Sequence, residues 1–144
     1  MPPVTPLSSA RCERLLRAGT FGRVAFRTPS GPEIIPVNYA VLDDAIVIRT
    51  DPVSLLARHS HGEPLAFEVD LVDYERWQGW SVVARGIGQC FADDELGSSA
   101  HRPRTWANGE RATIVRLAWT QLSGRRLGSG RDELSAMPVR QVLR

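Results

Sequence analysis

Lysine is absent from this sequence of 144 residues, and all 18 basic residues are arginine. Chemistry that depends on a lysine, such as formation of a Schiff base, is therefore excluded. An anion site must use guanidinium groups, hydroxyls or backbone amides instead. The formal net charge is only +2 and the arginines are scattered along the chain, so we expect no nucleic-acid partner.

Long hydrophobic runs are also missing. No stretch approaches the roughly 20 apolar residues of a membrane-spanning helix, and residues 1–9 lack the basic start and apolar core of a signal peptide. The only two cysteines, Cys12 and Cys90, do not make the pattern of a secreted disulfide scaffold. We therefore expect a cytoplasmic protein with free thiols and no membrane partner.

The composition, 42% hydrophobic and 24% charged, is typical of one globular domain. We expect an N-terminal arm at residues 1–9, a folded domain at 10–127 and a C-terminal tail at 128–144. Ser8 and Ser9 are good helix N-caps before apolar residues at helical spacing, which predicts a short helix ending at Gly19. A second short helix is predicted to start at residues 50–52.

Six segments have the residue content of β-strands, and turn residues or polar loops separate them. These segments are residues 23–27, 33–42, 45–49, 65–72, 80–91 and 113–122. They do not alternate with helices as the strands of a parallel sheet do. The pattern predicts a mainly β (α+β) fold, an antiparallel barrel with short peripheral helices.

Six short motifs follow one another at suitable spacing along the chain. They are GRVAF (22–26), PVNYAV (36–41), IVIRT (46–50), LAFEVD (65–70), GWSVVARG (79–86) and SGRRL (123–127). The ordered set resembles the pyridoxamine 5′-phosphate oxidase-like flavoproteins over about residues 10–127. This resemblance implies a six-stranded split β-barrel that forms a homodimer, with two FMN sites in the grooves between the subunits.

The resemblance also implies cofactor-binding residues. The strand along the isoalloxazine ring would be Pro36, Val37, Asn38 and Tyr39, and the phosphate would be held by Arg49, Thr50 and Ser54. Trp80 and Ser81 would lie near the dimer groove, and Trp106, Arg125 and Arg126 would approach the flavin from the partner subunit. Relatives often have a lysine where Leu55 stands, which predicts a weakened phosphate grip.

Taken without the resemblance, the same residues also fit structural roles. A helix start beside Arg49 can cradle an anion, but it can equally be a capped helix after a solvated strand end. Asn38 in an apolar strand needs hydrogen-bond partners, which neighbouring backbone, water or a flavin edge could supply. His59 and His61 have a spacing that can seat a metal, but no third ligand is apparent, so no metal site is expected.

Three functional hypotheses follow. The first is an FMN-dependent oxidoreductase that passes electrons from a reduced donor through FMN to a small acceptor. The second is a non-catalytic flavin- or haem-binding module, since no residue stands out as a general acid or base. The third is a reductase that uses a deazaflavin coenzyme on the same scaffold. In each case an incompletely closed barrel should leave apolar surface to bury, which predicts a homodimer on physical grounds as well.

Overall fold

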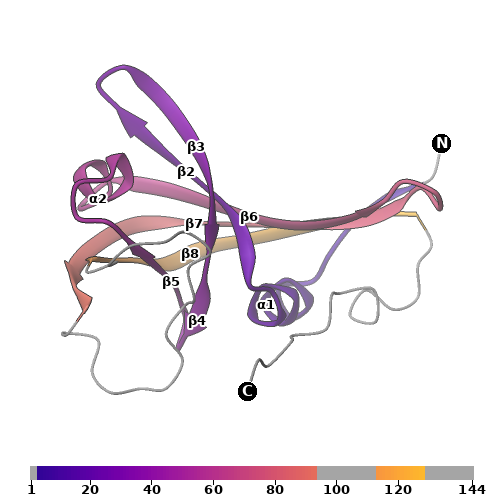
Figure 1. Ribbon diagram of the computed structural model, residues 1–144. Coiled ribbons are helices and arrows are strands. Elements are labelled where there is room, and N and C mark those ends of the chain that lie inside the picture. Colours follow the sequence, from indigo (N-terminus) through magenta and orange to yellow (C-terminus); the bar gives the residue numbers. More distant parts are fainter. Residues whose placement is uncertain (1–2, 94–112, 129–144) are drawn as a thin grey trace, which may run out of the picture.

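The computed structural model describes residues 3–93 and 113–128. Within these ranges the elements follow in the order β1–α1–β2–β3–β4–β5–α2–β6–β7–β8 (Figure 1). Trp106 and the expected tail beyond residue 128 lie outside the described residues. In the described part of the chain, neither helix has the length and apolar content to cross a membrane.

The first helix, α1 (Ser9–Ala18), begins where its cap was expected. The Ser8 hydroxyl accepts a hydrogen bond from the Arg11 N–H at 3.3 Å, and the helix ends before Gly19. Its apolar side, which includes Leu15 and Leu16, is buried in the core. The capping serine and the helical spacing of the apolar residues therefore both agree with the observed helix.

The second helix, α2 (Leu55–His59), is shorter than expected and begins later. Ser54 caps it, accepting a hydrogen bond from the Ala57 N–H at 3.1 Å. The prediction of a helix start at residues 50–52 is wrong. The Asp51 carboxylate instead accepts from the Val53 N–H at 2.9 Å, which makes a turn ahead of the helix.

The strands form one antiparallel sheet. They are β1 (Val4–Pro6), β2 (Phe21–Thr28), β3 (Gly31–Asn38), β4 (Ala40–Leu42), β5 (Ala45–Thr50), β6 (Pro64–Asp73), β7 (Gln78–Ala92) and β8 (Thr113–Leu127). Their order in the sheet is β3-β2-β6-β7-β8-β5-β4, with β1 paired to the far end of β8. The sheet curls into the predicted split barrel, so the fold class is confirmed. Within residues 1–9, expected as a loose arm, Val4–Pro6 is a paired strand.

The barrel closes at Tyr39. The single strand predicted at residues 33–42 is divided there into β3 and β4, which lie at opposite ends of the sheet order. Because one residue joins them, the sheet must bend until its two edges meet. The Tyr39 hydroxyl donates to the Leu16 carbonyl at 2.6 Å, and its ring packs edge-to-face on Phe67 with centroids 4.6 Å apart. These contacts anchor the closure to α1.

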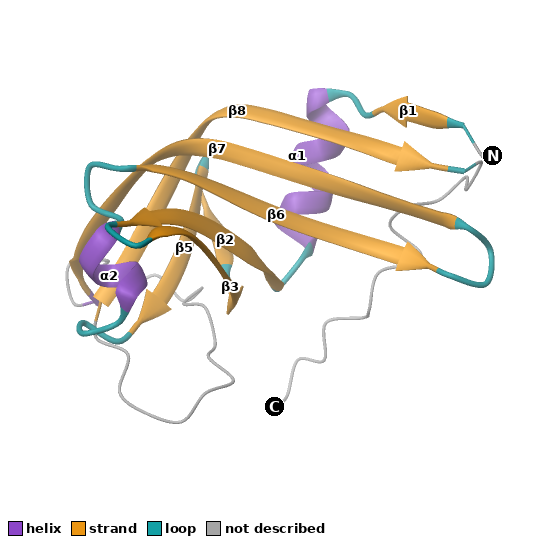
Figure 2. Cartoon of the chain, turned by 90° about the horizontal axis from the view of Figure 1, so that it is seen from above, coloured by secondary structure: helices purple, strands orange, loops and turns teal. Residues whose placement is uncertain are grey.

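Strands β6, β7 and β8 extend beyond the barrel as a long ribbon, with α1 packed on one side (Figures 1 and 2). We call the opposite side of the sheet the outer face. The register of β8 shifts opposite Arg85 and Gly86, which leaves Thr120 as an extra residue. This bulge lets β8 bend while it keeps Leu117 and Leu122 on the core side.

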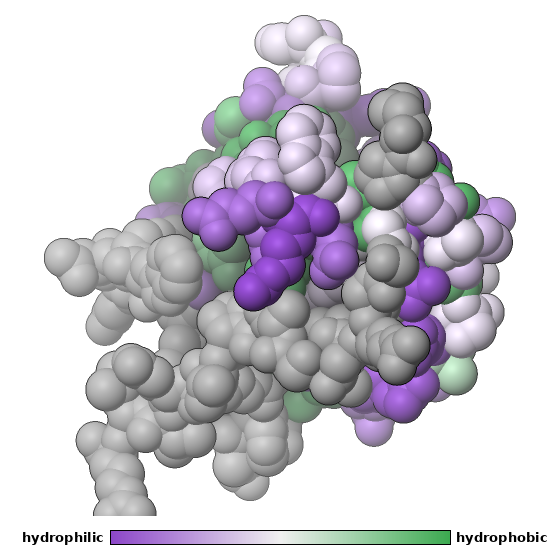
Figure 3. All heavy atoms as spheres, turned by 90° about the vertical axis from the view of Figure 1, so that its right-hand side faces the viewer, coloured by the Kyte–Doolittle hydropathy of each residue, from purple (hydrophilic) through white to green (hydrophobic). Residues whose placement is uncertain are grey.

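The tip of the β6–β7 hairpin is the end of this ribbon. Tyr74 and Trp77 are 84% and 71% exposed there. Figure 3 views the molecule from this end, where hydrophobic residues appear only in small separate areas.

Candidate functional site

Alternation along β3 divides the four residues predicted to line a flavin ring into two pairs. Successive side chains of a strand point to opposite faces of the sheet. Val37 and Tyr39 point to the core side, where Tyr39 is only 3% exposed. Pro36 and Asn38 point to the outer face, where they lie opposite Arg23 and Phe21. Only these two can present side chains to a ligand on that face.

The same alternation separates the predicted residues of β7 and β8. Ser81 lies directly opposite Arg125 on the outer face, and Trp80 lies opposite Arg126 on the core side. Trp80 is 5% exposed, and its indole N–H has no hydrogen-bond acceptor among the described residues. A ligand on the outer face can therefore reach Ser81 and Arg125, and the sheet shields Trp80 from it.

A charged cluster that the sequence reasoning missed lies on the outer face beside β3. Arg23, opposite Pro36, donates to Glu68 at 2.7 Å and to Asp70 at 3.3 Å. Partial burial and the negative charge of Asp70 raise the pKa of Glu68, while Arg23 acts in the opposite direction. The three residues come from two strands that are far apart in the sequence. The only sign of this cluster in the sequence is the alternation of charged and apolar residues along each strand.

The predicted phosphate segment is only partly assembled. Thr50 and Ser54 are brought together, with their hydroxyl oxygens 2.8 Å apart at the start of α2. Arg49 points to the other face and donates to the Asp93 carboxylate at 2.8 Å, in an ion pair whose side chains are 26% and 15% exposed. Leu55, the first residue of α2, is 46% exposed. A phosphate here would meet Ser54 more readily than Thr50, which is only 6% exposed, and would share Arg49 with Asp93.

The two groups of predicted site residues lie at opposite ends of the long strands. Arg49 pairs with Ile114, which pairs with Phe91 on β7. Phe91 lies ten residues from Ser81, roughly 30 Å along a strand that rises about 3.3 Å per residue. One protomer therefore does not bring Ser81 and Arg125 next to the phosphate segment.

Five apolar side chains are exposed at separate positions on the outer face of the sheet. By register they share this face with Ser81 and Arg125, and they are 36% to 67% exposed. They are Val4, Phe21, Ile34, Val72 and Ile87. Such surface on one side of a sheet is typical of an interaction face.

No metal site is present in the part of the chain that the structure describes. There, no group of three histidine, cysteine or carboxylate side chains could hold an ion, and this includes His59 and His61.

The comparisons with known proteins give a family model, a curated relative and solved structures that resemble this chain. A family model described as pyridoxamine 5′-phosphate oxidase matches residues 8–126. The chain is 33% identical over 130 residues to the uncharacterized protein Rv0080 of Mycobacterium tuberculosis, covering 86% of each. The structure of an FAD binding protein from Mycobacterium smegmatis has a TM-score of 0.66 at 28% identity, covering 87% of this chain and 99% of that one. An FAD-binding protein from Mesorhizobium loti shares the fold, with a TM-score of 0.70 at 23% identity and coverage of 87% and 99%.

Proposed function

The chain belongs to the pyridoxamine 5′-phosphate oxidase family, and from that premise we propose that it is a homodimeric FMN-binding oxidoreductase. The bound flavin would accept electrons from a reduced donor and pass them to a small acceptor. The observation that carries the proposal is the outward position of Pro36 and Asn38 on an edge strand of the barrel. They lie at the same end of the molecule as the Thr50–Ser54 pair, because Asn38 leads through Tyr39 into β4, which pairs with β5.

The edge of β3 suits a planar ring better than another strand. The Tyr39 N–H bonds to Thr20, so the odd-numbered residues of β3 turn their amides toward β2 and the even-numbered ones turn away. Two of the outward positions are Pro32 and Pro36, which have no N–H. Proline on an edge discourages pairing with a further strand. The apolar ring of Pro36 lies at this edge beside Asn38, whose side-chain amide donates to the Thr20 carbonyl at 3.5 Å and holds the side chain in place next to a bound ring.

The phosphate would be held mainly by hydroxyl and backbone groups. Thr50 and Ser54 are bonded to each other, so one of the two hydroxyls has its proton left for a phosphate oxygen, and the first amides of α2 lie beside them. Arg49 would contribute a guanidinium already partly neutralised by Asp93. Leu55 stands where relatives often have a lysine, so the phosphate site lacks a flexible cationic side chain. We therefore expect moderate affinity for FMN.

The outer face supports the proposed homodimer. A second copy can bury its exposed apolar side chains, because a two-fold interface is formed by the same surface of both subunits. A second copy can also place its Ser81 and Arg125 near the first protomer's phosphate segment, from which its own Ser81 is separated by roughly 30 Å of strand. The molar mass in solution tests this: we expect a dimer for the wild type and a weakened one for Ile34→Glu. Val53→Glu is the control, because Val53 is 75% exposed and lies in the turn before α2, off the sheet.

Other cofactors have support of their own. The names of two structural neighbours state FAD binding, and a third is described as an FAD and heme binding protein from Mycobacterium smegmatis, with 20% identity. A non-catalytic flavin- or haem-binding module is the second candidate, favoured because Glu68 and Asp70, the carboxylates beside β3, both pair with Arg23. A deazaflavin-dependent reductase is the third, favoured by the altered phosphate segment at Leu55.

The visible absorption spectrum tests the cofactor. The purified protein is mixed with FMN, FAD, a deazaflavin coenzyme or haem in separate samples and then freed of excess ligand by gel filtration. We expect FMN to be retained with flavin absorbance. A protein that stays colourless with both flavins contradicts the proposal. Anaerobic reduction by a nicotinamide donor then separates an oxidoreductase from a binding module, since a module retains the flavin without turnover.

A further inference from the structure

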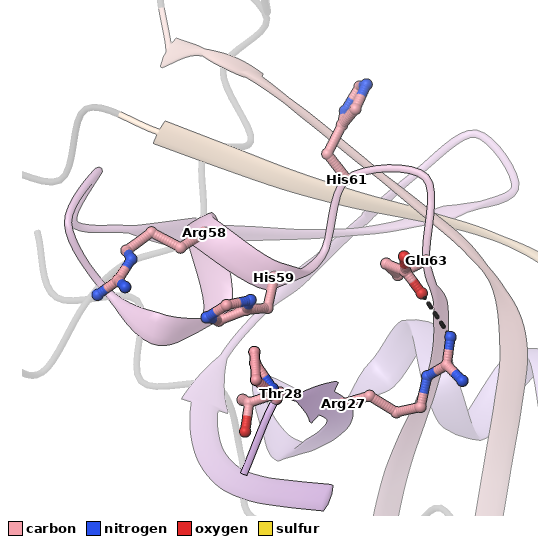
Figure 4. A pocket seen from close by; sticks show the side chains of 7 residues that line it. Arg27, Thr28, Arg58, His59, His61 and Glu63 are labelled. Carbon is pink, nitrogen blue, oxygen red and sulfur yellow. Dashed lines mark hydrogen bonds and ion pairs between the residues drawn. The ribbon is translucent and has the colours of Figure 1, made fainter. Parts of the chain in front are cut away.

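A pocket of about 390 Å³ lies at the end of α2 opposite its Ser54 cap (Figure 4). Three elements form it: the β2–β3 hairpin, the last turn of α2 and the connection from α2 to β6. Its lining residues are Arg27, Thr28, Pro29, Arg58, His59, His61 and Glu63. Guanidinium and imidazole groups therefore outnumber the single carboxylate.

Arg27 is held in place by that carboxylate. Its Nη2 donates to Glu63 at 2.8 Å, as the dashed line in Figure 4 shows. The guanidinium carries further N–H donors in a fixed plane, so the ion pair orients the group and leaves donors for a ligand. Glu63 also neutralises Arg27, which means that the net charge of the pocket comes from elsewhere.

Arg58 supplies that charge. Its guanidinium has no ion pair or hydrogen bond to any residue in the described ranges, and Arg58 is exposed. His59 follows it on the last turn of α2, and in Figure 4 its ring lies above Thr28 on the pocket side. The guanidinium of Arg58 and the imidazole of His59 thus lie on one side of the pocket, and Arg27 lies on the other side.

His61 stands at the rim and has a fixed tautomer. Its Nδ1 accepts the backbone N–H of Cys90 at 3.0 Å, so in the neutral ring the proton is on Nε2, a donor. Its ring projects away from the other side chains in Figure 4. A metal does not explain this group of side chains, because no three ligands are placed to hold one among the residues described.

We propose that this pocket binds the phosphoryl group of a small phosphorylated molecule. Arg27 on one side of the pocket, and Arg58 and His59 on the other, can donate N–H groups to the oxygens of a dianion between them, and arginine recognises phosphate through paired N–H groups. The volume exceeds what inorganic phosphate fills, which leaves room for an organic part of the ligand. The site is separate from the Thr50–Ser54 pair, because α2, five residues or about 7 Å long, lies between them.

An NMR titration of the full-length, ¹⁵N-labelled protein tests the proposal with inorganic phosphate and adenosine 5′-monophosphate as probes. Chloride at the same ionic strength corrects for general salt effects. We expect the amides of Thr28, His59 and Glu63 to shift together and to saturate. Tighter binding of the nucleotide would identify an organic phosphate as the ligand class, and equal binding would identify free phosphate. Amide shifts only at Thr50 and Ser54, or no saturation, would overturn the proposal.

Variants locate the site independently. Arg58→Gln and His59→Asn should each weaken phosphate at least fivefold. Arg14→Gln removes the same charge from an exposed position on α1 and should change nothing. Equal weakening by all three would show a general charge effect and overturn the proposal. We expect Arg58→Gln to retain FMN binding. Loss of flavin from this variant would mean that the pocket is part of the flavin site, and this would overturn the proposal of a separate site.

Discussion

Replacing Leu55 with lysine should strengthen flavin binding if the flavin phosphate lies at the start of α2. Leu55 directly follows the Ser54 cap and is 46% exposed, outside the core cluster. A surface substitution of this kind changes the stability of the fold by about 0.5 kcal/mol or less. The helix start is thus kept, and a flexible ammonium group is added beside the two hydroxyls.

The size of the gain follows from the exposure of the position. Two unit charges about 4 Å apart interact with about 1 kcal/mol in water and about 4 kcal/mol at the effective dielectric constant near a protein surface. Half-exposure, salt screening and the cost of ordering a long side chain reduce this to roughly 1 kcal/mol. That free energy corresponds to about a fivefold lower Kd for FMN.

Titration of flavin fluorescence with the wild type, Leu55→Lys and Leu55→Met measures the effect. Methionine is the control because it keeps an unbranched apolar chain without the charge. Riboflavin is the second control, because it has the ring and lacks the phosphate. The gain should appear for FMN, shrink in high salt and be absent for riboflavin. An equal gain for riboflavin, or no gain for FMN, would refute a phosphate at this helix start.

Three further substitutions test the site and the fold. Asp93→Asn should tighten FMN severalfold by freeing Arg49 for the phosphate; unchanged affinity in the same titration would remove Arg49 from the site. Gly86→Ala should destabilise the protein by about 1 to 3 kcal/mol in urea unfolding, because the added Cβ would clash with the Ala118 carbonyl oxygen of β8; exposed Gln89→Ala is the control. Burial raises the pKa of Glu68 above its ordinary 4.5, so its contribution to stability is complete below pH 4.5 and is lost as pH rises through the raised pKa. The free energy of unfolding of Glu68→Gln should therefore increase relative to that of the wild type as pH rises through this range. A difference between the two that does not depend on pH would contradict this.

Most of the fold could be predicted because its signals are local. The turns at residues 28–31 and at Asp43-Asp44, the Ser8 cap and the strand content each depend on a few adjacent residues. The break at Tyr39 could not be predicted, since it depends on a hydroxyl that bonds to Leu16 on another element. The strand at Val4–Pro6 was missed for a similar reason, because it exists only by pairing with the end of β8.

The candidate site was predicted less well because motif positions do not state which way a side chain points. Register turns Tyr39, Trp80 and Arg126 toward the core side and leaves their neighbours on the outer face. The Arg23 cluster and the pocket beside α2 were missed because their residues meet only in the folded chain. The cytoplasmic location and the absence of a nucleic-acid partner stay predictions.

If the proposed homodimer forms, flavin binding and dimerisation should be coupled, since in that proposal the residues that contact one ligand come from two copies of the outer face. A ligand that binds only the dimer stabilises it by about 2.7 kcal/mol at each site when present at 100 times its Kd. FMN should therefore restore dimers of the weakened Ile34→Glu variant, as measured by sedimentation velocity, while riboflavin, which lacks the phosphate contact, should do so less. Because linkage is reciprocal, diluting this variant to monomers should lower its FMN affinity by the same factor. Identical FMN affinity in monomer and dimer would mean that each protomer holds its flavin alone, with Ser81 and Arg125 outside the site.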